Sequence, residues 1–306
     1  MRERLARWYD GHRRTLPWRE DPTPYRVWVS EIMLQQTQVA TVLGYFDRFM
    51  TTFPTVAALA EAPEDQVLTM WAGLGYYRRC RMLHQAAGVV ADELGGVLPD
   101  TAAGLQRLPG VGRYTAAAIA SIAYGEAAAV LDGNVIRVLS RLMALETLSD
   151  STAGLKLLWD TAERLLDPLR ASAHNQAMME LGALVCTPKQ PRCEACPLRQ
   201  DCAAHAAGTA DRYPQKKPRK RATAVRGVAG FAVHKGRVLL ARRPDGGLLG
   251  GLWELPGGPL ASARTPRRPA VANHLRERLG LDAAIGSHLA TVEHLFTHRH
   301  LTLDVY

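Results

Sequence analysis

Four cysteines lie within seventeen residues, and their spacing constrains the fold more than any other feature of the chain. Cys186, Cys193, Cys196 and Cys202 follow the pattern C-x6-C-x2-C-x5-C, so one short loop must wrap around one centre. Four thiolates can enclose either a tetrahedral zinc ion or an iron–sulfur cubane. Zinc sites usually pair two C-x2-C knuckles across a longer gap, and this loop has one such knuckle. The spacing therefore favours an iron–sulfur cluster.

The total of five cysteines is odd, which is a poor basis for a disulfide framework. Cys80 stands apart from the other four, and we expect it to be a buried apolar residue. The formal net charge of +9 indicates an acidic polymer as partner, since Lys and Arg displace counterions from phosphates. Composition thus favours a nucleic acid as the ligand.

The chain shows no targeting or membrane-spanning signal. Residues 1–4 open no apolar run, and no stretch of about 18 apolar residues occurs anywhere. We expect a protein that is not secreted, has no membrane partner and works in the cytoplasm, at the nucleoid if the source is bacterial.

Apolar residues recur at three- and four-residue spacing over residues 25–50, 111–124 and 173–185, which predicts helices. No convincing strand pattern interrupts the first two thirds of the chain. With 306 residues, the sequence exceeds one ordinary domain. We therefore predict an all-α domain over residues 1–205, with the cysteine loop at residues 186–202.

A basic segment separates this domain from the rest. Residues 212–221, RYPQKKPRKR, hold six basic side chains and two prolines without one acid, so no core could absorb them. Residues 206–223 are read as an exposed connector, which is either a solvated linker or a strap along DNA phosphates.

Residues 224–306 predict a mixed α/β domain. Alternating residues on both sides of Lys235-Gly236 are typical of a hairpin, residues 269–279 of a helix and residues 300–306 of a strand. The strand pattern runs to Tyr306, which leaves open whether this domain is complete.

The turn LPGVG at residues 108–112 joins two helical segments. Gly110 and Gly112 would let N–H groups at a helix start approach a phosphate with no side chain between. A plain tight turn between helices is the other interpretation of this turn.

Two carboxylates are candidates for chemistry. Asp132, in LDGNV, precedes a helical segment, so it reads as an N-cap that the helix start keeps ionised. Glu31 lies three and four residues after Trp28 and Val27, beside an apolar stripe. Apolar walls would raise the pKa of this glutamate, which could then deliver a proton at neutral pH. A surface glutamate at the edge of the stripe is the alternative.

The cysteine spacing resembles the cluster loop of the endonuclease III superfamily, and the turn resembles its helix-hairpin-helix motif, placed here at about residues 105–125. Closer similarity is to the MutY-type adenine DNA glycosylases, through TLPWR, SEIMLQQTQV, GLGYY, LPGVGRYTA, LDGNV and NQAMMELGALVC. The resemblance covers essentially the first 205 residues and implies a 4Fe-4S cluster as cofactor. Residues of the cluster loop that would then meet DNA are Lys189, Arg192 and Arg199.

The resemblance also implies a mechanism in which a flipped adenine is excised. Glu31 would protonate N7 of the base, and Asp132 would stabilise the oxocarbenium-like sugar. Tyr114 and Asn134 would align Asp132 and the attacking water. The adenine pocket would comprise Trp18, Arg19 and Gln176, although a plain core role is the alternative for Trp18. Gln36 and Tyr76 would fill the gap that the extruded base leaves in the duplex.

Tyr114 separates two branches of the superfamily. Relatives that are also lyases carry a lysine at this place, as in GVGRKTA, and form a Schiff base with it. Because a phenol cannot form an imine, the sequence predicts a monofunctional hydrolase. The alternatives are a bifunctional pyrimidine-lesion glycosylase and AP lyase, and a catalytically silent DNA-binding protein.

The C-terminal segments WELPGGPL and HLRERLGL resemble a Nudix fold. Aligned on Gly280, the Arg-Glu pair of its metal box is replaced by Asn273 and His274, and the Glu-Glu pair by Glu277 and Arg278, so most of the metal ligands are missing. In MutY-type proteins a Phe-Ser-His loop of this domain senses 8-oxoguanine, and Phe296, Thr297 and His298 stand in that place. The implied partner is double-stranded DNA with adenine opposite 8-oxoguanine or guanine, bound by a monomer.

Overall fold

The computed structural model describes residues 1–218, 221–244, 247 and 249–306. The chain forms two compact units, Met1–Lys217 and Pro218–Tyr306. Arg219 and Lys220 of the predicted connector lie outside the described residues, as do residues 245, 246 and 248.

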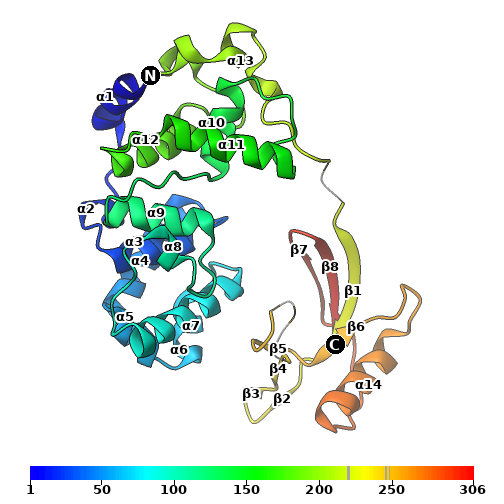
Figure 1. Cartoon of the computed structure of the whole chain (residues 1–306). Coiled ribbons are helices and arrows are strands. Elements are labelled where there is room, and N and C mark those ends of the chain that lie inside the picture. Colours follow the sequence, from blue (N-terminus) through cyan, green and yellow to red (C-terminus); the bar gives the residue numbers. More distant parts are fainter. Residues whose placement is uncertain (219–220, 245–246, 248) are drawn as a thin grey trace. The chain divides into compact units, whose positions relative to one another are not determined.

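The first unit is built from helices, as the apolar spacing predicted (Figure 1). They are α1 (Arg2–His12), α2 (Pro17–Glu20), α3 (Pro24–Leu34), α4 (Val39–Thr52), α5 (Val56–Glu61), α6 (Glu64–Trp71), α7 (Tyr77–Glu93), α8 (Ala102–Leu105), α9 (Arg113–Ala123), α10 (Gly133–Leu142), α11 (Thr152–Leu165), α12 (Ala171–Leu184) and α13 (Ala203–Ala206). Short 3-10 turns lie at Cys193–Ala195, Arg199–Asp201 and Ala210–Arg212.

The helices form two groups (Figure 1). In the group from α2 to α9, Phe49 packs edge-on against Phe53 and Trp71. In the other group, a core of α1, α10, α11 and α12 buries Leu5, Leu139, Leu158 and Leu181, which removes apolar surface from water. Helix α9 belongs with the first group and packs against both α3 and α12, so it joins the two groups.

The periodic stretch over residues 25–50 contains two helices rather than one. Helix α3 ends at Leu34 and α4 begins at Val39, and Gln36 between them has a φ of 57°. Apolar spacing continues across the break because both helices bury one face in the same core, while a left-handed residue cannot continue a right-handed helix. The break faces the site described below.

The second unit is α/β, as predicted. A sheet of order β6-β1-β8-β7 contains β1 (Thr223–Ala229), β6 (Gly257–Pro259), β7 (Ala290–Leu295) and β8 (Arg299–Val305). Strand β8 runs parallel to β1 and antiparallel to β7. Helix α14 (Arg267–Leu279) covers the sheet and packs Val271 and Leu275 against Val228.

The β-hairpin predicted around Lys235-Gly236 has its turn at these residues, but its two strands are shorter than the alternating pattern indicated. Strands β2 (Val233–His234) and β3 (Arg237–Val238) flank Lys235 and Gly236, whose φ angles of 47° and 73° suit a tight two-residue turn. The preceding strand, β1, pairs instead with β6 and β8. Strands β4 (Ala241–Arg242) and β5 (Trp253–Glu254) form a separate pair.

The connector begins as part of the helical unit. Tyr213 is buried, the Ser149 N–H donates to the Gln215 carbonyl at 2.8 Å, and Asp150 accepts from the Lys217 N–H at 3.2 Å. The division between the two units therefore lies at Lys217 and Pro218. None of the described helices is long and apolar enough to span a membrane.

Candidate active site

A cavity of about 940 Å³ opens between the two helix groups of the first unit. It is lined from α2 and α3, from the break after α3, from α9, from the start of α10 and from α12. The sequence-predicted residues that it brings together are Trp18, Arg19, Glu31, Gln36, Tyr114, Asp132, Asn134 and Gln176. Residues far apart in the sequence, from α2 to α12, thus meet at one site.

Glu31 lies on α3 and is 5% exposed, so the surface alternative is wrong. Its apolar neighbours on the helix, Val27 and Trp28, are also buried. Burial raises the pKa of this carboxyl, a hydrogen bond from Tyr114 lowers it, and the result is a pKa of about 7. A carboxyl group with this pKa can hold a proton at neutral pH and also release it.

Asp132 is the N-cap of α10, as the sequence indicated. Its Oδ1 accepts from the Val135 N–H at 2.7 Å, and its Oδ2 accepts from Asn134 Nδ2 at 2.8 Å. Burial raises the pKa of Asp132 above its usual value, and these hydrogen bonds oppose the shift. The helix start therefore lowers the pKa of Asp132, as expected, but burial raises it by more.

Asn134 is held in turn by Arg137, whose Nη2 donates to Asn134 Oδ1 at 2.9 Å and whose Nε donates to the Cys186 carbonyl at 2.6 Å. Gly182 permits this close packing of α12 on α10, because a Cβ there would lie 2.5 Å from Asn134 Cβ. The candidate site and the start of the cysteine loop therefore share one chain of hydrogen bonds.

The structure places Tyr114 differently from the predicted arrangement. Its hydroxyl donates to Glu31 Oε2 at 2.6 Å and lies 3.5 Å from Met179 Sδ, whereas the side chain that donates to Asp132 is Asn134. Tyr114 follows the first residue of α9, and α9 packs on α3, so its ring reaches the acid helix. Of the two residues expected to align Asp132, Asn134 is hydrogen-bonded to Asp132 and Tyr114 is hydrogen-bonded to Glu31.

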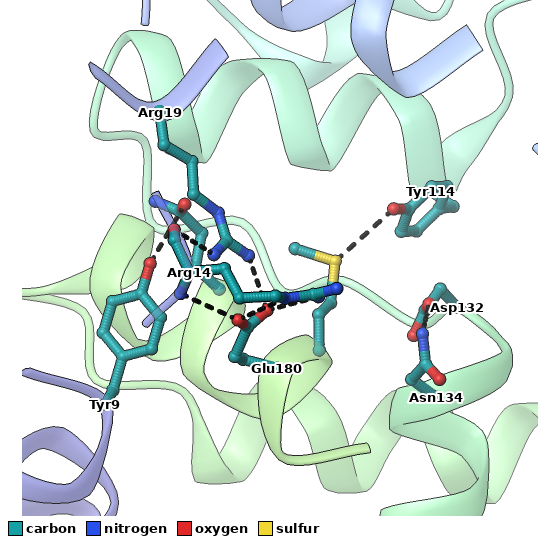
Figure 2. A network of polar contacts seen from close by, with 9 residues as sticks. Tyr9, Arg14, Arg19, Tyr114, Asp132, Asn134 and Glu180 are labelled. Carbon is teal, nitrogen blue, oxygen red and sulfur yellow. Dashed lines mark hydrogen bonds and ion pairs between the residues drawn. The ribbon is translucent and has the colours of Figure 1, made fainter. Parts of the chain in front are cut away.

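Sequence reasoning missed two residues that line the same cavity, Arg14 and Glu180. Glu180 has no exposed side-chain surface and pairs with Arg14 at 2.7 Å and Arg19 at 2.9 Å. Figure 2 shows both guanidinium groups turned toward this carboxylate. Burial alone would raise the pKa of Glu180, but the hydrogen bonds from both arginines prevail and lower it to about 2. The sequence held one signal for Glu180: it lies four residues after Gln176, so both residues share one face of α12.

Trp18 and Gln176, which line the same cavity, are held by different neighbours. Trp18 is 5% exposed and meets Phe46 edge-on with ring centroids 5.1 Å apart, so it belongs to the core and also lines the cavity. Gln176 accepts from the Tyr9 hydroxyl at 3.1 Å and donates to Ser172 Oγ at 3.2 Å. The wall of the cavity is therefore held in place by hydrogen bonds and aromatic packing.

The turn of the predicted helix-hairpin-helix motif, residues 108–112, joins α8 to α9. Gly110 has a φ of 75°, and a Cβ there would lie 2.5 Å from Met82 Cβ, so this position requires glycine. Gly112 is the N-cap of α9, and a Cβ there would meet nothing within 4 Å. The start of α9 is thus open to a ligand, as expected of an anion site at a helix N-terminus.

The four cysteines of the loop line one small cavity of about 30 Å³, together with Arg141 and Arg199. Arg141 Nη1 lies 3.3 Å from Cys186 Sγ. Among the described residues, no group of three or more His, Cys, Asp or Glu side chains is arranged to hold a metal ion. The donor set nevertheless fits a cluster, because four thiols share one enclosure.

The basic residues of this loop are exposed. The Arg199 guanidinium pairs with Glu194, and Arg192 donates to the Leu184 carbonyl. Lys189 lies in the turn after Cys186. All three can be reached from solvent, and two of them also brace the loop.

In the second unit, residues 296–298 form the tip between β7 and β8. The Phe296 N–H donates to the Arg299 carbonyl at 2.7 Å, and the Phe296 ring meets His294 edge-on. Thr297 and His298 are exposed. On α14, Arg278 stands where the Nudix metal box has a glutamate, and it pairs with Glu254 at 2.9 Å.

The comparisons with known proteins agree with this architecture. Residues 29–163 match the model of the HhH-GPD superfamily base excision DNA repair proteins, and residues 228–306 match the NUDIX domain. All of the chain aligns with an adenine DNA glycosylase of Homo sapiens at 40% identity and with one of Mus musculus at 41%. The chain spans 66% and 70% of their lengths.

A solved thermostable thymine-DNA glycosylase matches with a TM-score of 0.62 and 28% identity, over 67% of this chain and 94% of that one. The similarity covers a share of the chain comparable with the helical unit. The HhH-GPD match includes Glu31, Tyr114 and Asp132, whereas Glu180 lies beyond the matched residues.

Proposed function

This chain belongs to the adenine DNA glycosylase family of the HhH-GPD superfamily, and on that premise we propose that it hydrolyses the N-glycosidic bond of adenine mispaired with 8-oxoguanine or guanine. The supporting observation is that Glu31, with a pKa of about 7, lines the same cavity as Asp132. It acts as a monomer on duplex DNA in the cytoplasm.

The proton comes from Glu31. Adenine extruded from the duplex enters the cavity, and the protonated Glu31 carboxyl donates to N7 of the base, which turns adenine into a better leaving group. The Tyr114 hydroxyl, bonded to Glu31 Oε2 at 2.6 Å, fixes the orientation of the acid. Glu180, held by Arg14 and Arg19, presents an anionic wall to the same cavity.

Asp132 acts on the sugar. As the glycosidic bond breaks, positive charge develops on the deoxyribose, and the Asp132 carboxylate stabilises it electrostatically. The bonds from Val135 and Asn134 keep this carboxylate in place and oppose the rise of its pKa. Water then completes the hydrolysis.

The reaction is monofunctional, since no lysine is among the described residues that line the cavity and Tyr114 occupies the place of the Schiff-base lysine. Cys186, Cys193, Cys196 and Cys202 hold a 4Fe-4S cluster that orders the loop carrying Lys189, Arg192 and Arg199 for contact with DNA. Gly110 and Gly112 receive a phosphate at the start of α9. The 8-oxoguanine base is sensed by residues 296–298.

Alkali cleavage of duplexes with each mispair tests the function. Wild-type protein should produce strand scission with adenine opposite 8-oxoguanine or guanine, and none with cytosine opposite 8-oxoguanine. Glu31→Gln should abolish base release while duplex binding survives, and Glu61→Gln, an exposed glutamate, is the control. Normal excision by Glu31→Gln, or borohydride trapping of a covalent DNA complex, would refute the mechanism.

Recognition of the oxidised base has a separate test. His298→Ala should lower excision opposite 8-oxoguanine more than excision opposite guanine. The exposed His234, in the β2–β3 pair of the same unit, supplies the control His234→Ala. Equal losses on both mispairs would remove residues 296–298 from the recognition role.

A further inference from the structure

Arg79, in the first turn of α7, donates hydrogen bonds to the end of the helix that carries Glu31. Its Nη1 lies 2.8 Å from the Ile32 carbonyl and 2.9 Å from the Met33 carbonyl, and it also donates to the Gln35 carbonyl. The last carbonyl groups of a helix have no partner within it. One guanidinium therefore completes the C-terminus of α3.

The other amino group of Arg79 reaches the loops on either side. Nη2 donates to Thr37 Oγ1 at 3.2 Å, and to the carbonyls of Leu74 and Gly75 at 3.4 and 3.3 Å. The guanidinium carbon also lies 5.5 Å from the centroid of the Tyr76 ring. The segments 35–37 and 74–76 are thus joined through one side chain.

Each of the two segments contains a residue in a left-handed backbone conformation. Gln36 has a φ of 57° and Tyr76 a φ of 49°, which non-glycine residues rarely adopt and which the surroundings must hold in place. Gln36 lines the cavity, and the Tyr76 side chain is 47% exposed. The acceptors of Arg79 are immediate neighbours of these two residues.

We infer that Arg79 is a positioning residue that keeps Gln36 and Tyr76 at a fixed separation, so that both enter the duplex together when adenine is extruded. This inference rests on the proposed function. It adds that extrusion depends on a residue that contacts neither the base nor the reacting atoms. Lysine cannot replace it, because an ammonium lacks the planar fork that reaches acceptors on two sides.

The test separates extrusion from chemistry. Duplexes carry 2-aminopurine at the target position, whose fluorescence rises on unstacking, and Glu31→Gln prevents excision while protein saturates the DNA. Arg79→Lys is compared with Arg81→Lys, which lies on the same helix and pairs with Glu64 at 3.0 Å instead of with either segment. Single-turnover excision of adenine is measured with Glu31 intact.

Arg79→Lys should lower excision at least about tenfold, since a small misplacement far from the reacting atoms has effects of this size, and should at least roughly halve the fluorescence rise per bound complex. Arg81→Lys should change both by less than about twofold. An unchanged fluorescence rise in Arg79→Lys overturns the inference, even if excision falls. Failure of wild-type protein to release adenine would instead refute the proposed function.

Circular dichroism decides whether Arg79→Lys is folded at the assay temperature. If it is not, Thr37→Val removes one acceptor of Arg79 and leaves its contacts with α3 in place. This variant should lower the fluorescence rise by a smaller amount. A rise equal to that of the parent protein would overturn the inference by this route too.

Discussion

The Tyr114 hydroxyl donates a hydrogen bond of 2.6 Å to Oε2 of Glu31. This bond lowers the pKa that burial raises, so the value of about 7 is a balance between the two effects. Tyr114 stands in the first turn of α9, the helix whose start is open to a phosphate. One helix thus carries the open turn at its start and the hydroxyl that lowers the pKa of Glu31.

Tyr114→Phe should shift the alkaline limb of the pH–rate profile upward. Removal of the bond takes away the larger of the two effects that oppose burial, the other being the charge of Arg19, so the Glu31 pKa rises and the carboxyl keeps its proton to higher pH. The midpoint in kcat/KM, which reports the free enzyme, should move by about one pH unit. Tyr77→Phe, at a half-buried tyrosine that does not line the cavity, is the control, and an unmoved limb would separate Tyr114 from the acid.

Glu31→Gln should stabilise the fold at alkaline pH. The folded-state pKa of about 7 lies above the usual value of 4.5, so the glutamate favours folding when protonated, and this contribution is lost as pH rises through 7. The gain in unfolding free energy from the neutral amide should approach about 3 kcal/mol at pH 8. Melting temperatures at pH 8 and pH 4 measure it; an equal effect at both would contradict the assignment.

Glu180→Ala should destabilise the helical unit strongly. It leaves Arg14 and Arg19 without their shared buried partner, and loss of one member of a buried pair costs about 3–5 kcal/mol. Glu163→Ala, which breaks an exposed pair with Arg113, should cost less than about 1 kcal/mol. Urea denaturation compares them, and similar losses would show that the buried network contributes little.

Acid unfolding gives a second view of the same network. The pKa of Glu180 is held near 2, below its usual value of 4.5. Its contribution to stability is therefore present above pH 4.5 and is lost as pH falls toward 2. The difference in melting temperature between wild type and Glu180→Ala should shrink over this range.

Cys202→Ala should remove the cluster. Purified wild-type protein should absorb near about 400 nm and contain iron, and the variant should lose both signals. Cys80→Ala should retain them, because Cys80 is buried apart from the loop and its thiol donates to the Val67 carbonyl. A colourless wild type with one zinc would reverse the assignment.

The sequence predicted those features that depend on neighbouring residues, such as the capping of helices and the burial of an apolar stripe. Thr23 and Asp132 cap their helices because their side-chain oxygens accept from N–H groups three residues ahead. Glu31 was placed beside an apolar stripe, and the stripe is buried. Such features need only the residues within one or two helical turns, so they are readable from sequence.

Features that depend on tertiary contacts were not readable in the same way. The bond of Tyr114 to Glu31 spans 83 positions, and the pairing of Arg14 with Glu180 spans 166. The apolar pattern continues across Gln36 and gives no sign of the break between α3 and α4. The hydrogen bond to the Gln35 carbonyl at this break comes from Arg79, which lies on another helix. Family resemblance supplied roles for single residues but not these partners.

The position of β8 sets an order of events during synthesis. Residues 299–305 lie between β1 and β7, and they pair with both. Helices form from local contacts, whereas this parallel pairing joins Thr223 to Arg299 and must wait for the later segment. As the chain leaves the ribosome, the helical unit can therefore be complete while β1 still has an open edge.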